Sequence, residues 1–457
     1  MQLAHFQWLI VVGSSLALLW WAPRARTAEQ FFQGRSADRQ PGFWLLLSSL
    51  VISWLFAKSL TNAANLGLSY GLVGGIAYAT YYLSFAVAAY VILQLRTTGG
   101  FSSIHDFLLS KHGRGAVGVF SVLIAFRLFN EVWSNTMVIG SYFGDPGTGS
   151  YLGAVVVFTV LTLAYALKGG MSSSILTDVV QMALFGVLLA VLLTQLVGDL
   201  PSLAGNTETL SRYDAGSPTW GVWTLAGGVD LLLVALVQSF SYPFHDPVLT
   251  DRGFISDTRT TRRAFWWAVP VGAICIVLFS LVGVFARAKG FEGQAAVEVA
   301  RYLGTASMLV VNLIMVTSAA STLDSTFSSW SGLATRWGAK RTISAGRIAM
   351  CALAMLGTIP VFLKPEILSA TTISGLMVVG LSPVFLLWRW DVPKWAFHAA
   401  VFGGLAVGIH YATIGVPGWL KFGGGNYAGL LGATVFGTGL AFALFVGSRV
   451  FSPRPSA

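Results

Sequence analysis

The chain alternates between long apolar runs and short joints that are polar or rich in Gly and Pro. A helix that spans a membrane needs about 20 mostly apolar residues, and about thirteen runs approach this length. The expected spans are residues 5–22, 43–66, 71–95, 114–143, 150–167, 174–197, 222–247, 264–287, 303–332, 341–363, 366–388, 394–413 and 427–447. The pattern therefore predicts an all-α membrane protein of about 13 transmembrane helices, without a sizeable soluble domain.

Two of the expected spans are interrupted. The second and its continuation read SWLFAKSLTNAANLGLSYGLVGG over residues 53–75, where a lysine and two asparagines precede four glycines. In the seventh, Pro243 and Pro247 flank His245 and Asp246, and each proline removes an amide donor. Interrupted spans at matching positions are typical of transporters built from inverted repeats. The simpler alternative is a proline kink together with a glycine packing face. We expect both spans to be broken.

Composition supports a polytopic protein, since 55% of the 457 residues are hydrophobic, 10% are charged and the mean hydropathy is +0.71. The first run, after MQLAHFQW, lacks a basic leader region, so we expect a retained span and not a signal peptide. Cys275 and Cys351 both lie in predicted spans. They therefore indicate neither a disulfide framework nor a zinc site.

The net charge of +10 is explained by topology. If the N-terminus is outside, the basic residues gather in the inner joints, as the positive-inside rule requires. Nucleic acid is then not an expected partner, and the protein is expected in the cell membrane with a cytoplasmic C-terminus. The inner basic residues are Arg24, Arg26, Arg35, Arg39, Arg96, Lys111, Arg114, Lys168, Arg252, Arg259, Arg262, Arg263, Arg336, Lys340, Arg341, Arg389, Lys394, Arg449 and Arg454, and the longest outer joint carries Asp199, Glu208, Arg212 and Asp214.

Five motifs occur in a characteristic order along the chain. They are AEQFFQGRSADRQPGFW (28–44), GGMSSSILTDVVQ (169–181), TDRGFISDTRTTRRA (250–264), STLDS (321–325) and LSPVFLLWRW (381–390). Together they resemble the sodium:solute symporter family, whose members share the LeuT-type fold. The segment from Trp54 to Ala79 and the FHD of residues 244–246 resemble its urea-carrying branch.

The resemblance implies a 5+5 inverted repeat with broken second and seventh spans. Residues 1–42 would form the first span and an inner joint, 43–197 repeat one, 222–390 repeat two, and 391–457 two accessory spans. The implied function is sodium-coupled transport of a small polar solute by alternating access. Na⁺ would be the coupling ion, and no organic cofactor or protein partner is indicated beyond membrane lipid.

The resemblance also implies a first sodium site. Sodium is a hard cation that neutral oxygens hold well, and hydroxyls and carbonyls of broken helices supply them. The Ser321 and Thr322 hydroxyls and the Ser318 carbonyl would be joined by the carbonyls of Thr61 and Ala64. A shifted register would use Ala63 and Leu66 instead. The structural alternative is that the hydroxyls bond back to carbonyls of their own helix.

A second sodium site is implied at Asp178, Asp324 and Ser325. A carboxylate at mid-membrane costs at least ~2.5 kcal/mol, so it normally faces a partner or an aqueous path. The alternatives are a helix cap for Asp178 and a hydrogen bond to nearby backbone for Asp324. Proton coupling through Asp178, Asp324 or His245 also stays open.

Solute-binding groups are expected where the broken spans cross. The candidates are Asn62, Asn65, Asn130, Glu131, Tyr242, His245 and Asp246. Arg127 and Glu131 are spaced i, i+4 and are expected to neutralise one another. Positive charge would then be scarce, which favours an uncharged solute. Alternatively, Asp246 caps the broken seventh span.

Catalysis is not expected. The pair His245 and Asp246 is the main candidate constellation, and no nucleophile in a known motif accompanies it. A proton-coupled symporter, a solute-gated channel or a sensor of the same fold are the remaining alternatives to a sodium symporter.

Overall fold

The computed structural model describes residues 2–34, 40–204, 220–336, 341–363 and 368–451, and these residues form helices and no strand. Several residues used above to predict the topology lie outside the described residues: Arg35, Arg39, Glu208, Arg212, Asp214, Lys340 and Arg454.

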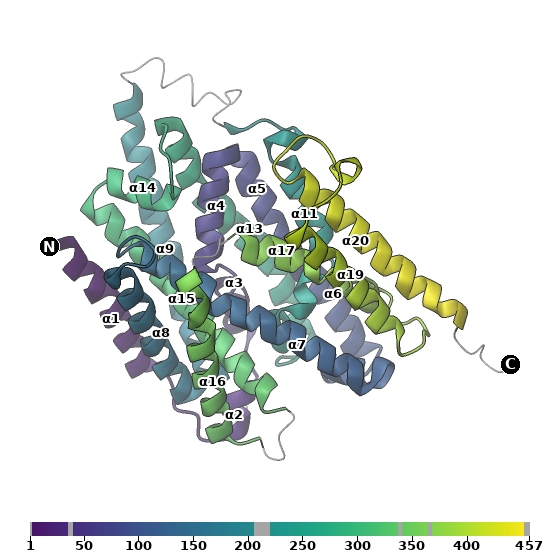
Figure 1. The fold of residues 1–457 in the computed structure, drawn as a ribbon. Helices are drawn as coiled ribbons and strands as arrows, with labels where there is room; N and C mark the ends of the chain where they lie inside the picture. Colours follow the sequence, from purple (N-terminus) through teal and green to yellow (C-terminus); the bar gives the residue numbers. More distant parts are fainter. Residues whose placement is uncertain (1, 35–39, 205–219, 337–340, 364–367, 452–457) are drawn as a thin grey trace. The chain divides into compact units, whose positions relative to one another are not determined.

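The helices follow the predicted spans closely (Figure 1). Among the described residues, ten helices are long and apolar enough to cross a membrane, and the bent pair Phe43–Ile52 and Ala57–Tyr70, with an angle of 58°, makes eleven if it is counted as one span. This is fewer than the roughly thirteen spans predicted. The chain is thus a multi-pass membrane protein. The α-helices are α1 (Gln2–Trp21), α2 (Ala28–Gln33), α3 (Phe43–Ile52), α4 (Ala57–Tyr70), α5 (Leu72–Ala79), α6 (Leu83–Thr97), α7 (Ile104–Ser141), α8 (Gly149–Gly169), α9 (Met171–Ala204), α11 (Val229–Gln238), α12 (Pro247–Arg252), α13 (Thr258–Lys289), α14 (Ala295–Tyr302), α15 (Thr305–Ala334), α16 (Ile343–Thr358), α17 (Ser369–Met377), α18 (Leu381–Leu386), α19 (Ala396–Thr413) and α20 (Ala428–Gly447).

The predicted seventh span is broken, as expected. It consists of α11, the 3₁₀ turn η4 (Tyr242–His245) and α12. Pro243 lies in the first turn of η4 and Pro247 at the start of α12, where a missing amide hydrogen leaves no intrahelical bond unmade. The predicted eleventh span is also divided, into α17 and α18, which the sequence did not indicate.

The described chain forms two compact units. Unit 1 comprises Met1–Ala79, Leu128–Val222 and Pro270–Ile367, and unit 2 comprises Thr80–Arg127, Trp223–Val269 and Leu368–Ala457. Each unit takes segments from both predicted repeats, and α7 and α13 contribute to both units. The units are a different division from the predicted repeat boundaries, which stay a prediction.

Helix α15 is the core of unit 1. It packs against α9, α8, α16 and α1. Within the most apolar stretch of each helix, 78% of α15 is buried inside the protein, compared with 17% of α1. The buried surface of α15 is rich in small hydroxyl residues, which allow close helix packing in membranes. Helix α1 lies beside α8 (Figure 1) and exposes large apolar side chains such as Trp20.

Glycines set the close approach of α4 to α13 within unit 1. A Cβ atom at Gly283 would lie 1.8 Å from the Ala64 carbonyl oxygen, and one at Gly67 would lie 2.3 Å from the Ser280 carbonyl oxygen. Gly71 then ends α4 with a φ of 64°, a conformation that glycine adopts without strain. These glycines therefore serve packing and helix termination.

In unit 2, α19 and α20 lie side by side (Figure 1) and pack with α11 and α17 around one apolar cluster. The cluster contains Val234, Leu376, Val379, Leu430, Leu431 and Ala433.

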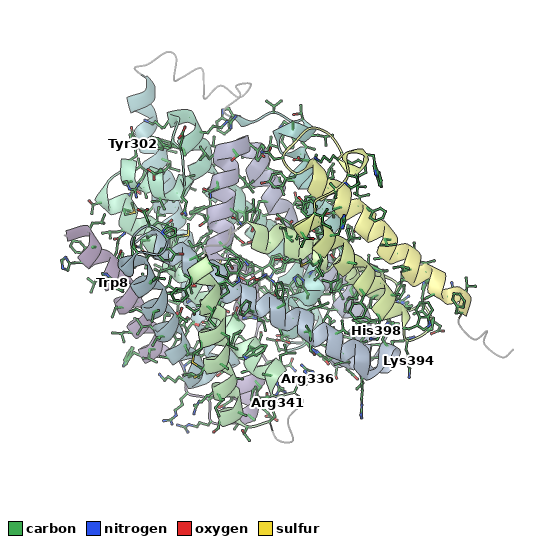
Figure 2. All side chains as sticks on the ribbon, viewed as in Figure 1. Trp8, Tyr302, Arg336, Arg341, Lys394 and His398 are labelled. Carbon is green, nitrogen blue, oxygen red and sulfur yellow. The ribbon has the colours of Figure 1, made fainter. Side chains whose placement is uncertain are left out.

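Joints that were predicted on the same membrane face meet within each unit. In unit 1 the Arg341 guanidinium lies 4.4 Å from the Phe32 ring centre, and Figure 2 shows Arg336 and Arg341 at the end of the unit remote from Tyr302. In unit 2, Arg96 donates hydrogen bonds of 2.7 Å to the carbonyls of Gly253 and Ser256. Both contacts join segments predicted on one membrane face, and which face is inside stays a prediction.

Candidate functional site

The second span breaks between α3 and α4, at residues 53–56, and not at the glycines that follow. The break itself contains neither Gly nor Pro. Where α3 ends, the Ser53 and Leu55 amides still donate to the Ser49 and Val51 carbonyls, whereas other carbonyls at a helix end lack intrahelical partners. Such carbonyls are the oxygens that a broken helix can offer a cation.

The break corrects one predicted part of the first sodium site. Thr61 and Ala64 lie inside the regular helix α4, so their carbonyls are not those of an unwound segment. The Ala64 carbonyl instead faces the Gly283 position of α13. The alternative pair, Ala63 and Leu66, also lies inside α4. The break was predicted near the glycines because the sequence alone does not distinguish a glycine that allows close helix packing from one that interrupts a helix.

A buried hydroxyl cluster surrounds Asp178 in unit 1. The Asp178 carboxylate accepts hydrogen bonds from Ser49 on α3 and from Ser321 on α15, both at 2.5 Å. Ser53, which follows α3, lies 3.4 Å from the same carboxylate. Asp178 is completely buried and lies about two turns inside α9, so it does not cap that helix.

Asp324 joins the same cluster from α15. Its carboxylate accepts hydrogen bonds from Ser174 at 2.7 Å and from Thr177 at 3.0 Å, both on α9. The Ser325 hydroxyl lies 2.9 Å from Ser174 and 3.0 Å from Ser53. A chain of hydroxyls thus connects the two carboxylates. The three residues predicted for a second sodium site, Asp178, Asp324 and Ser325, thus lie together, and the site itself stays a prediction.

The α15 residues predicted for the first site, Ser318, Ser321 and Thr322, lie close together on that helix. Thr322 donates to the Ser318 carbonyl at 2.9 Å, which is the structural alternative for Thr322, whereas Ser321 bonds to Asp178 and not to its own helix. The Ser318 hydroxyl is fully buried, and it has no hydrogen-bond partner among the described residues. A buried hydroxyl in this position suits a bound cation.

The donor set fits an alkali cation. Among the described residues, no group of three or more His, Cys, Asp or Glu side chains could hold a metal ion. Hydroxyl, carbonyl and carboxylate oxygens are the ligands of hard cations, and transition metals prefer softer donors.

The predicted solute-binding residues fall into two sets, one in each unit. In unit 1, Glu131 forms an ion pair with Lys58, with Nζ and Oε1 2.7 Å apart and both side chains buried. Asn135 donates to the other Glu131 oxygen at 2.8 Å and accepts from the Lys58 backbone amide at 3.2 Å. This cluster fixes the first turn of α4 to α7.

The asparagines of unit 1 have different partners. Asn62 donates to the Tyr78 hydroxyl at 3.4 Å, and Asn130 accepts from the Trp133 indole at 3.0 Å. Asn65 accepts from the Ala295 amide at 3.0 Å, at the start of α14. Asn65 therefore caps a helix, which weakens its assignment to the solute.

In unit 2, Asp246 forms a buried ion pair with Arg127 at 2.9 Å. Its other oxygen accepts from the Val248 amide at 2.9 Å and caps α12, as the structural alternative expected. The Arg127 guanidinium also lies 5.2 Å from the Tyr242 ring centre, and the Tyr242 and His245 rings are 4.7 Å apart. These four side chains form one cluster.

A cavity of about 320 Å³ borders this cluster. Arg127 and His245 line it together with Phe126, Ser374, Met377 and other mostly apolar residues of unit 2. Arg127 and Glu131 thus each have a partner of opposite charge within their own unit, Asp246 and Lys58. The sequence analysis did not predict either partner.

Four polar residues of these clusters were missed: Ser49, Ser53, Ser174 and Thr177. A signal was present for all four. Ser49 and Ser53 are spaced i, i+4 on an otherwise apolar stretch, and Ser174 and Thr177 share the helix face of Asp178. Lys58 was noticed, but its partner Glu131 is 73 positions away.

Comparison with known proteins supports the fold. No family model matches the chain. A urea active transporter of Saccharomyces cerevisiae (strain ATCC 204508 / S288c) is 22% identical over 265 residues, which cover 53% of this chain and 35% of that protein. The chain thus matches about a third of the length of this curated relative.

Three solved structures are similar over nearly their whole length. A substrate-bound, outward-open Na⁺-coupled sialic acid symporter matches with a TM-score of 0.70 at 14% identity, covering 98% of each chain. MhsT in complex with L-phenylalanine matches with 0.55 at 13% identity, covering 93% of this chain and 99% of that one. Mhp1, a nucleobase-cation-symport-1 family transporter, matches in a closed conformation with 0.51 at 11% identity, covering 94% and 96%. The chain therefore has the LeuT-type fold that its motifs predicted.

Proposed function

We propose that the chain is a sodium-coupled symporter of a small polar solute that works by alternating access. One observation carries the proposal: the completely buried Ser321 hydroxyl lies between the carboxylate of Asp178 and the break in the second span. Carboxylates buried at membrane depth are costly unless they are paired, hold a ligand or line its path, and such residues often mark an ion or solute pathway.

The proposed first sodium site combines Ser318, Ser321 and Thr322 with carbonyls of the break at residues 53–56. The 3.5 Å distance between the Ser53 and Ser321 hydroxyls supports this choice. The proposed second site uses Asp178, Asp324 and Ser325, with Ser321 and Ser174 beside them. The relative with the TM-score of 0.70 is described as Na⁺-coupled, with a novel Na⁺ site.

The proposed solute carries no net charge. Glu131 is balanced by Lys58 in unit 1, and Asp246 is balanced by Arg127 in unit 2. A charged solute would need a counter-charge that neither pair offers without breaking. Neutral polar groups are present within each unit: Asn62 and Asn130 in unit 1, and Tyr242 and His245 in unit 2. Urea, which the yeast relative is named for, is a solute of this class.

Coupling requires only differential affinity. Sodium stabilises the conformation that also binds the solute, and by linkage the solute raises the affinity for sodium equally. A membrane potential adds about 2.3 kcal/mol per charge and per 100 mV to the driving force. None of these steps requires a covalent bond to be made or broken.

Uptake of radiolabelled urea and of uncharged polyols, sugars and nucleobases by liposomes containing the purified protein tests the proposal. We expect concentrative uptake of at least one solute with an inward sodium gradient, and none with choline at constant pH. Equal uptake in sodium and choline would refute sodium coupling. Uptake that follows an imposed proton gradient instead would favour the proton-coupled alternative, which the hydroxyl chain between Asp178 and Asp324 could serve.

A further inference from the structure

A single buried amide joins four segments of unit 2. The Gln238 side chain, at the end of α11, is completely buried. Its oxygen accepts a hydrogen bond of 2.7 Å from the Tyr81 hydroxyl. Its nitrogen donates to the Thr372 carbonyl at 3.1 Å and to the Thr434 hydroxyl at 3.3 Å. A carbonyl oxygen can only accept, so the Thr372 contact fixes which end of the amide is the NH₂ group. Both amide hydrogens therefore have an acceptor, and the oxygen has a donor.

The packing around this amide is tight. Helices α11, α17 and α20 are neighbours (Figure 1), and a Cβ atom at Gly375 of α17 would lie 2.1 Å from the Gln238 side-chain oxygen. The 3₁₀ turn η1 (Thr80–Tyr82), which carries Tyr81, packs on α11 as well. The amide is thus confined by α17, while its hydrogen bonds reach η1, α17 and α20.

Tyr81 connects the amide to the candidate solute residues of unit 2. The Tyr81 ring centre lies 5.7 Å from that of Tyr242, and Tyr242 contacts His245 and Arg127. If the Tyr81 ring turned away, its hydroxyl would leave the Gln238 oxygen without a donor, and an unpaired buried acceptor is costly. The amide therefore restricts where the Tyr81 ring can lie against Tyr242.

We propose that Gln238 is a positioning residue that holds Tyr81 against Tyr242, and that α20 takes part through the Thr434 hydroxyl. The inference rests on the proposed function and deepens it, because Tyr242 is one of the candidate solute-binding residues. It gives a role to α20, which the sequence analysis treated as an accessory span. Without the Thr434 hydroxyl, one amide hydrogen of Gln238 loses its acceptor, and the amide holds Tyr81 less firmly.

Uptake kinetics in liposomes test this role, with radiolabelled urea, sugars, polyols and nucleobases as probes and an inward sodium gradient. Gln238→Leu and Tyr81→Phe should each raise the half-saturating solute concentration by about 2- to 10-fold, the effect of one lost hydrogen bond. The maximal rate should change little, and so should the sodium affinity without solute, measured by thermal shift. Since both variants remove the same contact, the double variant should show less than the product of the two single effects.

Thr434→Val is a milder variant, because it keeps the shape of the side chain and removes only the hydroxyl. It should raise the half-saturating solute concentration by about 2- to 5-fold, whereas Thr434→Ser, which keeps the hydroxyl, should behave like the unmodified protein. Thr438→Val is the matched control. Thr438 lies one turn further along α20, and its hydroxyl has no hydrogen-bond partner among the described residues.

The proposal is overturned if Gln238→Leu and Thr434→Val leave the half-saturating solute concentration unaltered, and the proposed function then survives. It is also overturned if sodium affinity without solute falls in parallel with solute affinity, because that result indicates a general structural role. If Gln238→Leu does not fold, the comparison of Thr434→Val with Thr434→Ser and Thr438→Val decides. If the unmodified protein takes up none of the probes, the proposed function fails and the proposal fails with it.

Discussion

Ser321 donates a 2.5 Å hydrogen bond to Asp178, so a hydroxyl of the first proposed sodium site touches a carboxylate of the second. The two proposed sites are therefore in direct contact. Removing this hydroxyl should affect both sites, whereas Thr322 and Asp178 each belong to one site.

The first prediction concerns sodium dependence. Ser321→Ala combined with Thr322→Ala should raise the half-saturating sodium concentration by roughly ten-fold or more, since two oxygen ligands are lost. The free energy of unfolding should fall by only about 1–2 kcal/mol, so the variant should still fold. Ser331→Ala is the control, because that hydroxyl bonds within α15 to the Ser328 carbonyl. Loss of folding in parallel with sodium dependence would return the pair to a structural role.

The second prediction concerns the number of coupled ions. Uptake plotted against sodium concentration should give a Hill coefficient above one in the unmodified protein, and a value of one in Asp178→Asn, because one of two sites is removed. In Thr322→Ala the Hill coefficient should stay above one, while the affinity for sodium falls. A coefficient of one in the unmodified protein would argue against a second site.

The third prediction concerns Lys58 and Glu131. Replacing either alone, Lys58→Met or Glu131→Gln, leaves a buried charge without its partner and should cost about 3–5 kcal/mol of stability. The double variant should be more stable than either single variant. The free energies of unfolding in mixed detergent micelles, measured for the unmodified protein, both single variants and the double variant, give the interaction energy of the pair. Additive losses would show that the two side chains do not interact.

The fourth prediction concerns Asp246. Asn retains an acceptor suited to capping α12 but removes the charge that balances Arg127. Asp246→Asn should raise the half-saturating solute concentration by roughly ten-fold, with the sodium affinity in the absence of solute nearly unchanged. Adding Arg127→Gln should restore stability but not solute affinity. If Asp246→Asn leaves the solute affinity unaltered, the only roles of Asp246 are to cap α12 and to pair with Arg127.

The fifth prediction concerns the packing of α4 on α13. Gly283→Ala would place a Cβ atom 1.8 Å from the Ala64 carbonyl oxygen and 2.6 Å from the Leu68 amide nitrogen. Backbone must therefore move, and we expect a loss of at least about 1–3 kcal/mol. Gly186→Ala in α9 is the control, since nothing lies within 4 Å of its Cβ position. That variant should be neutral or slightly more stable. Thermal unfolding of both variants in detergent compares them.

The sequence predicted the fold well because the length of each apolar run and the positions of Gly and Pro along the chain are local signals. The span predicted at 394–413 is the helix Ala396–Thr413, and the breaking effect of Pro243 and Pro247 was visible directly. The break at residues 53–56 was not visible, because it lies in the apolar run SWLF, which local composition does not distinguish from a continuous helix.

The candidate site was predicted less completely, because its contacts join distant positions. The resemblance drew attention to Ser321 and Asp178, yet nothing local pairs Ser49 with a residue 129 positions away. The pairing of Asp246 with Arg127 spans 119 positions. It changes the reading of Asp246 from an available acid to a neutralised one, which only the folded arrangement could reveal.

The hydroxyls around Asp178 and Asp324 matter for the stage of the proposed transport cycle at which neither sodium nor solute is bound. After a symporter has released sodium and solute, it must change back to its starting conformation with both sites empty. Two buried carboxylates without hydrogen-bond donors would slow that step. Ser49, Ser321, Ser174 and Thr177 donate to these carboxylates directly. A hydroxyl hydrogen rotates about its C–O bond, so the same oxygen can turn a lone pair to a cation or a proton to a carboxylate. In the proposed transport cycle, both buried carboxylates would thus keep hydrogen-bond donors after the cations have left.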